Sequence, residues 1–188
     1  MANLILASSS PRRKELLEKL SVPFESYSPN IDESIESQLP PGDIVTTLAA
    51  RKAKKAARLY PHSFVIGSDT IVVYRHKILG KPASRESAKK MLSELSGNTH
   101  SVYTGVAVIH DETIHTFYEK TDVIFWELSD EDIEKYVNTG EPFDKAGAYG
   151  IQGQGGLLVK SIQGDYYSVV GLPIGRLLRV LKKMGYPV

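Results

Sequence analysis

The sequence has no cysteine among its 188 residues. Without thiols the chain cannot form a disulfide, a thiolate metal site or a cysteine nucleophile. Long apolar runs are also missing, and no segment approaches the roughly 20 apolar residues that span a bilayer. The first four residues, Met-Ala-Asn-Leu, carry no basic region before an apolar one. We therefore expect no signal peptide and a cytoplasmic protein with no membrane partner.

A strong excess of charge of either sign is missing as well. Lys and Arg number 23 and Asp and Glu number 22, so the formal net charge is +1. A chain so close to neutrality offers no electrostatic case for binding nucleic acid or a membrane surface. The length fits a single domain over residues 1–188, built as one body or as two lobes.

The segment 64–73 is a β-branched, apolar run interrupted by the polar cluster Gly-Ser-Asp-Thr at 67–70. A strand of this kind is usually buried on both faces, and Asp69 within it would be costly unless its charge were compensated. One interpretation is a strand that lifts the Asp69 carboxylate into a cleft. The other is a turn between two short strands, with Asp69 capping it. The local pattern favours neither.

Residues 8–13, Ser-Ser-Ser-Pro-Arg-Arg, are typical of a helix start. Ser10 suits the N-cap and Pro11 the first helical position. Arg12 and Arg13 are electrostatically unfavourable there, because that end of a helix is already positive. Hydroxyls such as that of Ser8, free helix N–H groups and two guanidinium groups suit a multiply charged anion. The alternative is a capped surface helix with exposed arginines, and the misplaced charge favours the anion site.

Apolar periodicity predicts helices alternating with strands, interrupted by two hairpins. Such an order indicates an α/β fold with a mixed sheet. Residues 30–34 read as an acidic, solvated loop. We expect strands at 4–7, 24–28, 99–109 and 114–126, a hairpin turn at 75–77, helices at 43–59, from 84 to about 95, from 129 and from 173, and two paired strands at 157–162 and 166–170.

The segment 141–156 contains five glycines from Gly147 to Gly156. A loop of this length without structure of its own is usually functional or disordered. Phe143 and Tyr149 argue against disorder, and glycines let the backbone approach a ligand closely. We expect a functional loop.

Several familiar motifs are absent. There is no Walker A loop, dinucleotide fingerprint or nucleophile elbow, and the five histidines lack metal-ligand spacing. The basic loop at the helix start, the strand-borne aspartate and the glycine-rich loop remain. Together they suit a phosphorylated ligand, a hard cation and a water activated by a carboxylate.

Four segments, 8–13, 67–70, 80–82 and 144–153, resemble in order and spacing the signature segments of the Maf family. These are nucleoside triphosphate pyrophosphatases first linked to septum formation, and the likeness covers about residues 4–181. The resemblance implies a mixed, twisted sheet with flanking helices and two lobes around a deep cleft, as in inosine triphosphatases. It implies hydrolysis of a nucleoside triphosphate to the monophosphate and pyrophosphate with Mg²⁺ or Mn²⁺. A homodimer fits the family, although the sequence locates no interface.

The resemblance also assigns roles to residues. It makes Asp69 the proton acceptor, and at the substrate-sorting positions Arg12, Thr70 and Gln152 it matches the branch that takes dTTP and UTP. Glu33 with Asp69 would bind the metal. The remaining expected contacts are with the triphosphate and the leaving pyrophosphate, made by Ser8, Ser10, Arg12, Arg13, Lys52, Lys81 and Lys145.

The chemistry of Gln152 agrees with a uracil or thymine base. Such a base presents the O4 acceptor and the N3–H donor. An amide can donate to O4 through its NH₂ group and accept from N3–H through its carbonyl oxygen. A base with the opposite pattern would leave buried polar groups unpaired and be rejected. The alternative for Gln152 is an amide that closes the loop onto its own backbone.

Two other functions compete with this one. The first is a pyrophosphatase for a modified purine nucleotide, which would prefer ITP or 7-methyl-GTP. The second is a non-catalytic regulator of septum formation that senses nucleotides. Its nucleic-acid-binding version is weakened by the near-neutral charge.

Overall fold

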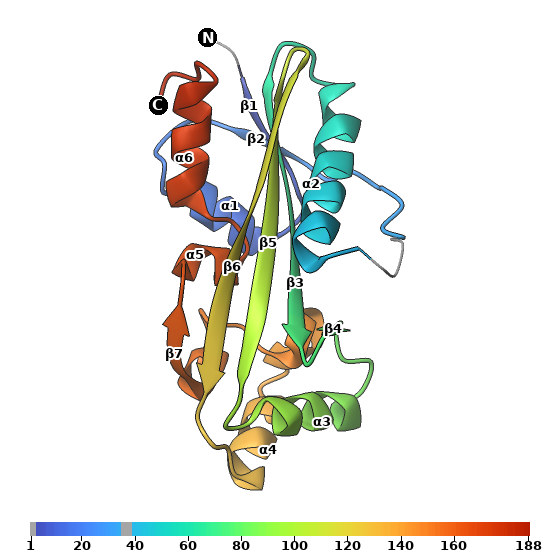
Figure 1. Ribbon diagram of the computed structural model, residues 1–188, viewed down its shortest axis with the longest axis vertical. Coiled ribbons are helices and arrows are strands. Elements are labelled where there is room, and N and C mark those ends of the chain that lie inside the picture. The colour runs from blue at the N-terminus through green and yellow to red at the C-terminus, as the bar shows by residue number, and fades with distance from the viewer. Residues whose placement is uncertain (1–2, 35–38) are drawn as a thin grey trace. The chain divides into compact units, whose positions relative to one another are not determined.

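The computed structural model describes residues 3–34 and 39–188 (Figure 1). Strands alternate with helices along most of this part of the chain. The elements are β1 (Leu4–Ala7), α1 (Pro11–Glu18), β2 (Glu25–Tyr27), α2 (Pro41–Ala57), β3 (Phe64–Tyr74), β4 (Lys77–Leu79), α3 (Arg85–Leu95), β5 (Thr99–His110), β6 (Thr113–Phe125), α4 (Asp130–Asn138), the 3-10 helices η1 (Glu141–Asp144), η2 (Ala146–Ala148) and η3 (Gln154–Leu158), β7 (Val159–Gln163), α5 (Tyr166–Val170) and α6 (Ile174–Lys183).

The strands of the described residues form a seven-stranded mixed sheet. Its order is β2-β1-β3-β5-β6-β7, and β4 pairs with β3 outside this path. β1 runs parallel to β2 and β3, whereas β4 is antiparallel to β3 and β7 is antiparallel to β6. The α/β class with a mixed sheet is therefore confirmed. Among the described helices, none has the length and apolar character needed to cross a membrane.

Contacts divide the chain into two compact units. The first comprises Met1–Thr70, Thr104–Glu119 and Gly171–Val188, and the second comprises Ile71–Tyr103 and Lys120–Val170. The boundaries fall inside β3, β5 and β6, so each of these strands contributes residues to both units.

β3 continues through the polar cluster at 67–70, so the alternative of a turn there is wrong. The parallel register with β1, in which Ala7 faces Gly67, keeps this part of the chain extended. A Cβ on Gly67 would lie 2.1 Å from the backbone oxygen of Ala49 and 3.0 Å from the Cβ of Ala53. Glycine is needed because α2 packs directly against the strand.

The core of the first unit consists of small and β-branched side chains. They come from β1, β3, β5 and one face of α2. Three alanines in this face allow the helix to lie close to the strands. The cluster comprises Ile5, Ala7, Ala49, Ala53, Ala56, Val65, Ala107 and Ile109.

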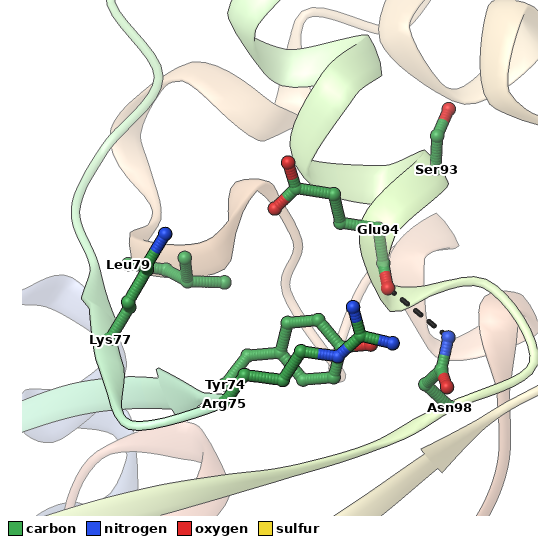
Figure 2. Close-up of a pocket in the computed structure, with 7 residues that line it drawn as sticks. All are labelled: Tyr74, Arg75, Lys77, Leu79, Ser93, Glu94 and Asn98. Atoms are coloured by element: carbon green, nitrogen blue, oxygen red, sulfur yellow. Dashed lines mark hydrogen bonds between the residues drawn. The ribbon is translucent and has the colours of Figure 1, made fainter.

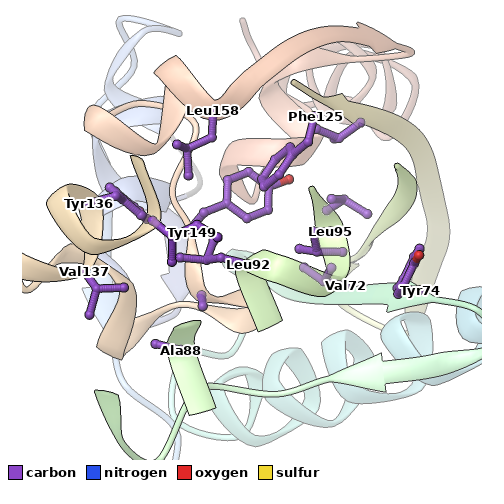
Figure 3. Packing of buried hydrophobic residues seen from close by; sticks show 14 residues of the cluster. Val72, Tyr74, Ala88, Leu92, Leu95, Phe125, Tyr136, Val137, Tyr149 and Leu158 are labelled. Carbon is purple, nitrogen blue, oxygen red and sulfur yellow. The ribbon is translucent and has the colours of Figure 1, made fainter. Parts of the chain in front are cut away.

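The core of the second unit is larger and more aromatic, as Figure 3 shows. Helices α3 and α4 supply Leu92, Leu95 and Val137, which pack around Phe125 and Tyr149. These helices begin directly after Ser84 and Ser129, close to the predicted starts, and each of these serines forms a capping box.

Two expectations for the C-terminal third are wrong. Residues 166–170 form the helix α5, and β7 pairs with β6 instead. The Asp165 carboxylate accepts the N–H of Ser168 at 2.9 Å, and the Ser168 hydroxyl contacts that of Thr121 at 2.8 Å. These contacts outweigh the strand preference of the β-branched residues. The segment 141–156 does have structure of its own, because it contains η1, η2 and most of η3.

Burial of His100 in the second core predicts a loss of stability in acid. Its Nε2 lies 2.7 Å from the Tyr149 hydroxyl, and its ring packs edge-to-face against Phe125. Desolvation lowers the pKa of His100 from 6.5 to about 4, with Asp122 opposing the shift. The unfolded chain therefore takes up this proton near pH 6.5 and the folded chain only near pH 4. The contribution of neutral, buried His100 to the free energy of unfolding is therefore complete above pH 6.5. It should fall by about 2–3 kcal/mol between pH 7 and 4.5.

The measurement is urea unfolding at both pH values for the wild type and His100→Gln. Carboxylates titrate in both proteins, so the difference between their pH dependences isolates His100. Parallel pH dependences would show that the imidazole is protonated equally in the folded and unfolded chains.

Candidate functional site

The loop between β1 and α1 has the features of an anion site. Ser10 is the N-cap with extended backbone, and Pro11 begins the helix, as predicted. The Ser10 side chain makes no capping hydrogen bond, and its N–H donates to the Ser8 Oγ at 3.2 Å. The first turn of α1 is therefore not capped by its own serine, and such uncapped N–H groups suit an oxyanion.

Arg13 lies inside the first unit and is held by three protein oxygens. Its Nε donates to the Gly171 carbonyl at 2.8 Å, and its terminal nitrogens donate to the Thr70 Oγ1 at 3.0 Å and to the Ser8 Oγ at 3.4 Å. Burial lowers the pKa of Arg13, while the Asp69 carboxylate opposes this shift. The guanidinium remains charged in any protein. Arg13 thus places a fixed positive charge near the strand-borne aspartate.

Thr70 connects Arg13 to the neighbouring strand. Its hydroxyl accepts from Arg13 and lies 2.8 Å from the hydroxyl of Thr104, which is fully buried on β5. Gly171, whose carbonyl also binds Arg13, has φ +131°, a value that favours glycine. Sequence reasoning missed both Thr104 and Gly171, because neither lies in a motif and their contacts arise only in the folded chain.

The charge of Asp69 is compensated by Lys52 from α2. The Lys52 Nζ lies 2.5 Å from the Asp69 Oδ1 and 3.1 Å from the Glu33 Oε1. The side chains of Lys52 and Asp69 are each 13% exposed, whereas that of Glu33 is 64% exposed. One ammonium group therefore joins two carboxylates, and one of these pairs is shielded from water. The positive charge that Asp69 requires is thus supplied by Lys52, which belongs to the same unit.

Of the sequence-predicted site residues, Ser8, Ser10, Arg12, Arg13, Glu33, Lys52, Asp69 and Thr70 belong to the first unit. The structure joins Ser8, Arg13 and Thr70 in one hydrogen-bond network and Glu33, Lys52 and Asp69 in one charge cluster. The electrostatic effect of Asp69 on Arg13 links the two groups.

Lys81, Lys145 and Gln152 belong to the second unit. The Lys145 Nζ donates to the Glu141 carbonyl at 2.8 Å and to the Asp144 carboxylate at 2.6 Å. Lys81 and Gln152 are exposed. Within the described chain the Gln152 amide has no hydrogen-bond partner, so the loop-closing alternative for this residue is not seen.

A cavity of about 480 Å³ lies elsewhere in the second unit, between the β3–β4 hairpin and the end of α3 (Figure 2). Its lining includes none of the predicted site residues. The Arg75 guanidinium lies over the Tyr74 ring, and the Asn98 amide donates to the Glu94 carbonyl. Both groups therefore interact with neighbouring residues of the protein. Because the lining also lacks every predicted site residue, we do not take this cavity as the candidate site.

Asp69 and Glu33 have the chemistry of a hard-cation site. Their carboxylates already converge on one positive group, the ammonium of Lys52. Mg²⁺ is usually bound by one or two carboxylates with substrate phosphates and water. Among residues 3–34 and 39–188 no group of three or more His, Cys, Asp or Glu that could hold a metal is found. Of the residues that the structure describes, a site here would therefore use two carboxylates at most.

Comparison with known proteins agrees with the signature segments. A family model described as Maf-like protein matches residues 3–184. A Bacillus cereus (strain ATCC 14579) protein named dTTP/UTP pyrophosphatase is 56% identical over 188 residues, covering all of this chain and 98% of that protein. A Bacillus cytotoxicus protein of the same name is 56% identical over 183 residues, 97% of this chain and 96% of its own. A Bacillus anthracis protein, also of this name, is 55% identical over 188 residues, all of this chain and 98% of its own.

The family model covers nearly the whole described chain, and the identity to these relatives extends from end to end. The chain belongs to the Maf-like protein family.

Proposed function

We propose that the protein hydrolyses nucleoside triphosphates, dTTP and UTP in particular, to the monophosphate and pyrophosphate. The observation that carries this proposal is the shielded contact between Lys52 and Asp69, with Glu33 on the same ammonium and Arg13 nearby. A carboxylate held by cations beside an uncapped helix start suits water-driven cleavage of a phosphoanhydride. The printed names of relatives at 55–56% identity support the same activity.

The triphosphate binds at the start of α1 in this proposal. The first-turn N–H groups, the Ser10 hydroxyl and Arg12 contact phosphate oxygens, because a helix N-terminus favours negative charge. Arg13 contributes mainly its charge, since its nitrogens already donate to Gly171, Thr70 and Ser8. The arginines that are unfavourable for helix stability thereby gain a role in binding the substrate.

Asp69 acts on the attacking water. The carboxylate orients the water and accepts its proton as the oxygen bonds to the α-phosphorus. The bond from the α-phosphorus to the oxygen that bridges it to the β-phosphorus breaks, and pyrophosphate leaves with that oxygen. Lys52 keeps the carboxylate in place through the 2.5 Å contact. In the same proposal, Lys81 and Lys145 neutralise charge on the leaving pyrophosphate.

The proposal includes a divalent cation, Mg²⁺ or Mn²⁺. Asp69 and Glu33 are the residues that would hold it, in keeping with their shared contact to Lys52. When bound, the cation would neutralise charge on the phosphate oxygens.

Gln152 recognises the base. Its exposed amide can donate to O4 and accept from N3–H of uracil or thymine. Cytosine presents an amine in place of O4 and an acceptor at N3, so it would mismatch an amide that keeps the orientation used for uracil; the proposal therefore requires that the bound amide does not turn over. Discrimination of this kind can be large because the mismatched polar groups remain unpaired.

Asp69→Asn should lower turnover of UTP by about a hundredfold or more, because an amide cannot take the proton of the attacking water. The measurement is pyrophosphate release at saturating UTP, with circular dichroism to show that the fold is kept. Asp111→Asn is the matched control, since this exposed carboxylate pairs with His62 on the surface. If Asp69→Asn keeps most of the activity, Asp69 has no role in the reaction.

Removal of divalent cations with EDTA should abolish pyrophosphate release, and Mg²⁺ or Mn²⁺ should restore it. Glu33→Gln should raise the Mg²⁺ concentration for half-maximal activity at least about tenfold, as expected for loss of a ligand. Full activity in EDTA would contradict the cation requirement. A wild type that binds UTP tightly without cation-dependent turnover would instead favour the non-catalytic regulator.

Gln152→Ala should lower the preference for UTP over CTP, measured as the ratio of kcat/KM values, by at least about tenfold. The panel includes dTTP, ITP and 7-methyl-GTP. A wild type that prefers ITP or 7-methyl-GTP would establish the modified-purine alternative and remove Gln152 from pyrimidine recognition.

A further inference from the structure

We infer that Glu141 is a positioning residue that fixes the backbone on either side of Gln152 and so sets base preference. The inference rests on the proposed function, because it takes Gln152 as the group that recognises the base. All of the contacts that carry it lie within the second unit.

The Glu141 carboxylate is almost saturated with donors from its own unit. Its Oε1 accepts from the Tyr136 hydroxyl at 3.0 Å and from the Gly155 N–H at 3.2 Å. Its Oε2 accepts from the Gln154 N–H at 3.0 Å. A carboxylate offers about four acceptor positions, and bonds to a charged acceptor are the stronger kind. Two adjacent backbone N–H groups are thus bound to the side chain of a residue 13 and 14 positions earlier.

Tyr136 extends this network to the other side of Gln152. Its hydroxyl donates to Glu141 and accepts the N–H of Gly150 at 3.2 Å. Burial raises the pKa of Tyr136, so the hydroxyl remains protonated and able to donate. The Tyr136 side chain is part of the second core, which gives the network a rigid base.

These bonds anchor the backbone at Gly150 and again at Gln154 and Gly155. Three residues, 151–153, lie between the anchors, and Gln152 is the middle one. A three-residue span with both ends fixed has few backbone conformations, so the backbone that carries Gln152 is in place before substrate arrives.

The glycines fit the same arrangement. A Cβ on Gly153 would lie 2.4 Å from the Glu141 Oε2, and one on Gly155 would lie 2.6 Å from the Tyr136 hydroxyl oxygen. A Cβ on Gly150 would lie 2.5 Å from the Lys145 Cε. The backbone therefore wraps closely around the carboxylate, the phenol and the lysine stem. At Gly155 the Cβ would also lie 2.6 Å from the backbone oxygen of Gly150, so a larger residue there would have to displace the backbone of the loop.

The test compares Glu141→Gln with the wild type on UTP and CTP. The amide keeps the size of the side chain but places an NH₂ group against backbone donors, so at least one anchor is lost. We expect the preference for UTP over CTP to fall at least about tenfold. In contrast, kcat at saturating UTP should stay within about threefold, since Ser10, Lys52 and Asp69 are untouched.

Glu134→Gln is the matched control. Glu134 lies on α4 in the same unit, but its carboxylate pairs with Arg85 and Lys89 and not with the loop. This variant should keep the wild-type preference. Amide hydrogen exchange provides a readout besides activity, because Gln154 and Gly155 should exchange faster in Glu141→Gln and not in Glu134→Gln.

Two further variants separate positioning from general damage. Tyr136→Phe removes the acceptor for the Gly150 N–H and should also lower the preference for UTP over CTP.

The second variant combines Glu141→Gln with Gln152→Ala. Adding Glu141→Gln to Gln152→Ala should change the remaining preference for UTP over CTP less than about twofold, because the residue that Glu141 positions is gone. A similar loss in both backgrounds would show that Glu141 acts elsewhere and overturn the inference.

The inference and the proposed function fail in different ways. If the wild type releases no pyrophosphate from any nucleotide, the proposed function is wrong. If the wild type prefers UTP, and Glu141→Gln is folded and keeps both that preference and the slow exchange of Gln154 and Gly155, only the role of Glu141 is wrong. Should Glu141→Gln fail to fold, Tyr136→Phe decides the question by the base preference and by the amide hydrogen exchange of Gly150, whose N–H it releases.

Discussion

The contact between Lys52 and Asp69 depends on how closely α2 approaches β3. Gly67 allows the backbone of Ala49 and Ala53 to lie directly on the strand. Side chains alternate along a strand, so Asp69 projects on the same side as Gly67, two residues further along. Lys52 directly precedes Ala53, and its long stem reaches the carboxylate. A larger residue at position 67 would push the helix away and separate the two charges. The partly buried aspartate is tolerated because a small residue near it brings the Lys52 ammonium within reach.

Arg13 is a second case in which charge and packing have to be considered together. In sequence, two arginines in the first turn of a helix indicate a bound anion, because they are unfavourable there otherwise. In the structure, part of that cost is offset within the protein, since Arg13 donates to Gly171, Thr70 and Ser8 and is influenced by Asp69. The sequence argument did not foresee that one of the arginines is occupied by the protein itself.

The sequence predicted the elements whose signals are local. Capping serines, the proline after Ser10 and the alanine face of α2 lead to helices that begin and end near the expected residues. It failed at residues 166–170, where Val169 and Val170 favour a strand but Asp165 and Thr121 hold a helix. It could not single out Lys52 among the other basic residues of α2 without the family resemblance. Thr104 and Gly171 left no signal, because their contacts join residues 34 and 158 positions apart.

The two hydrogen-bond networks suggest how chemistry and base preference can vary separately. The cluster of Asp69, Lys52 and Glu33 draws only on residues of the first unit, and the network of Glu141, Tyr136 and the glycine-rich loop draws only on the second. A substitution that changes the amide presented at position 152 leaves the carboxylate and its cation in place. Under the proposed roles, substitutions in the loop alone would change the base that is accepted, provided that the residue at position 141 still anchors the loop.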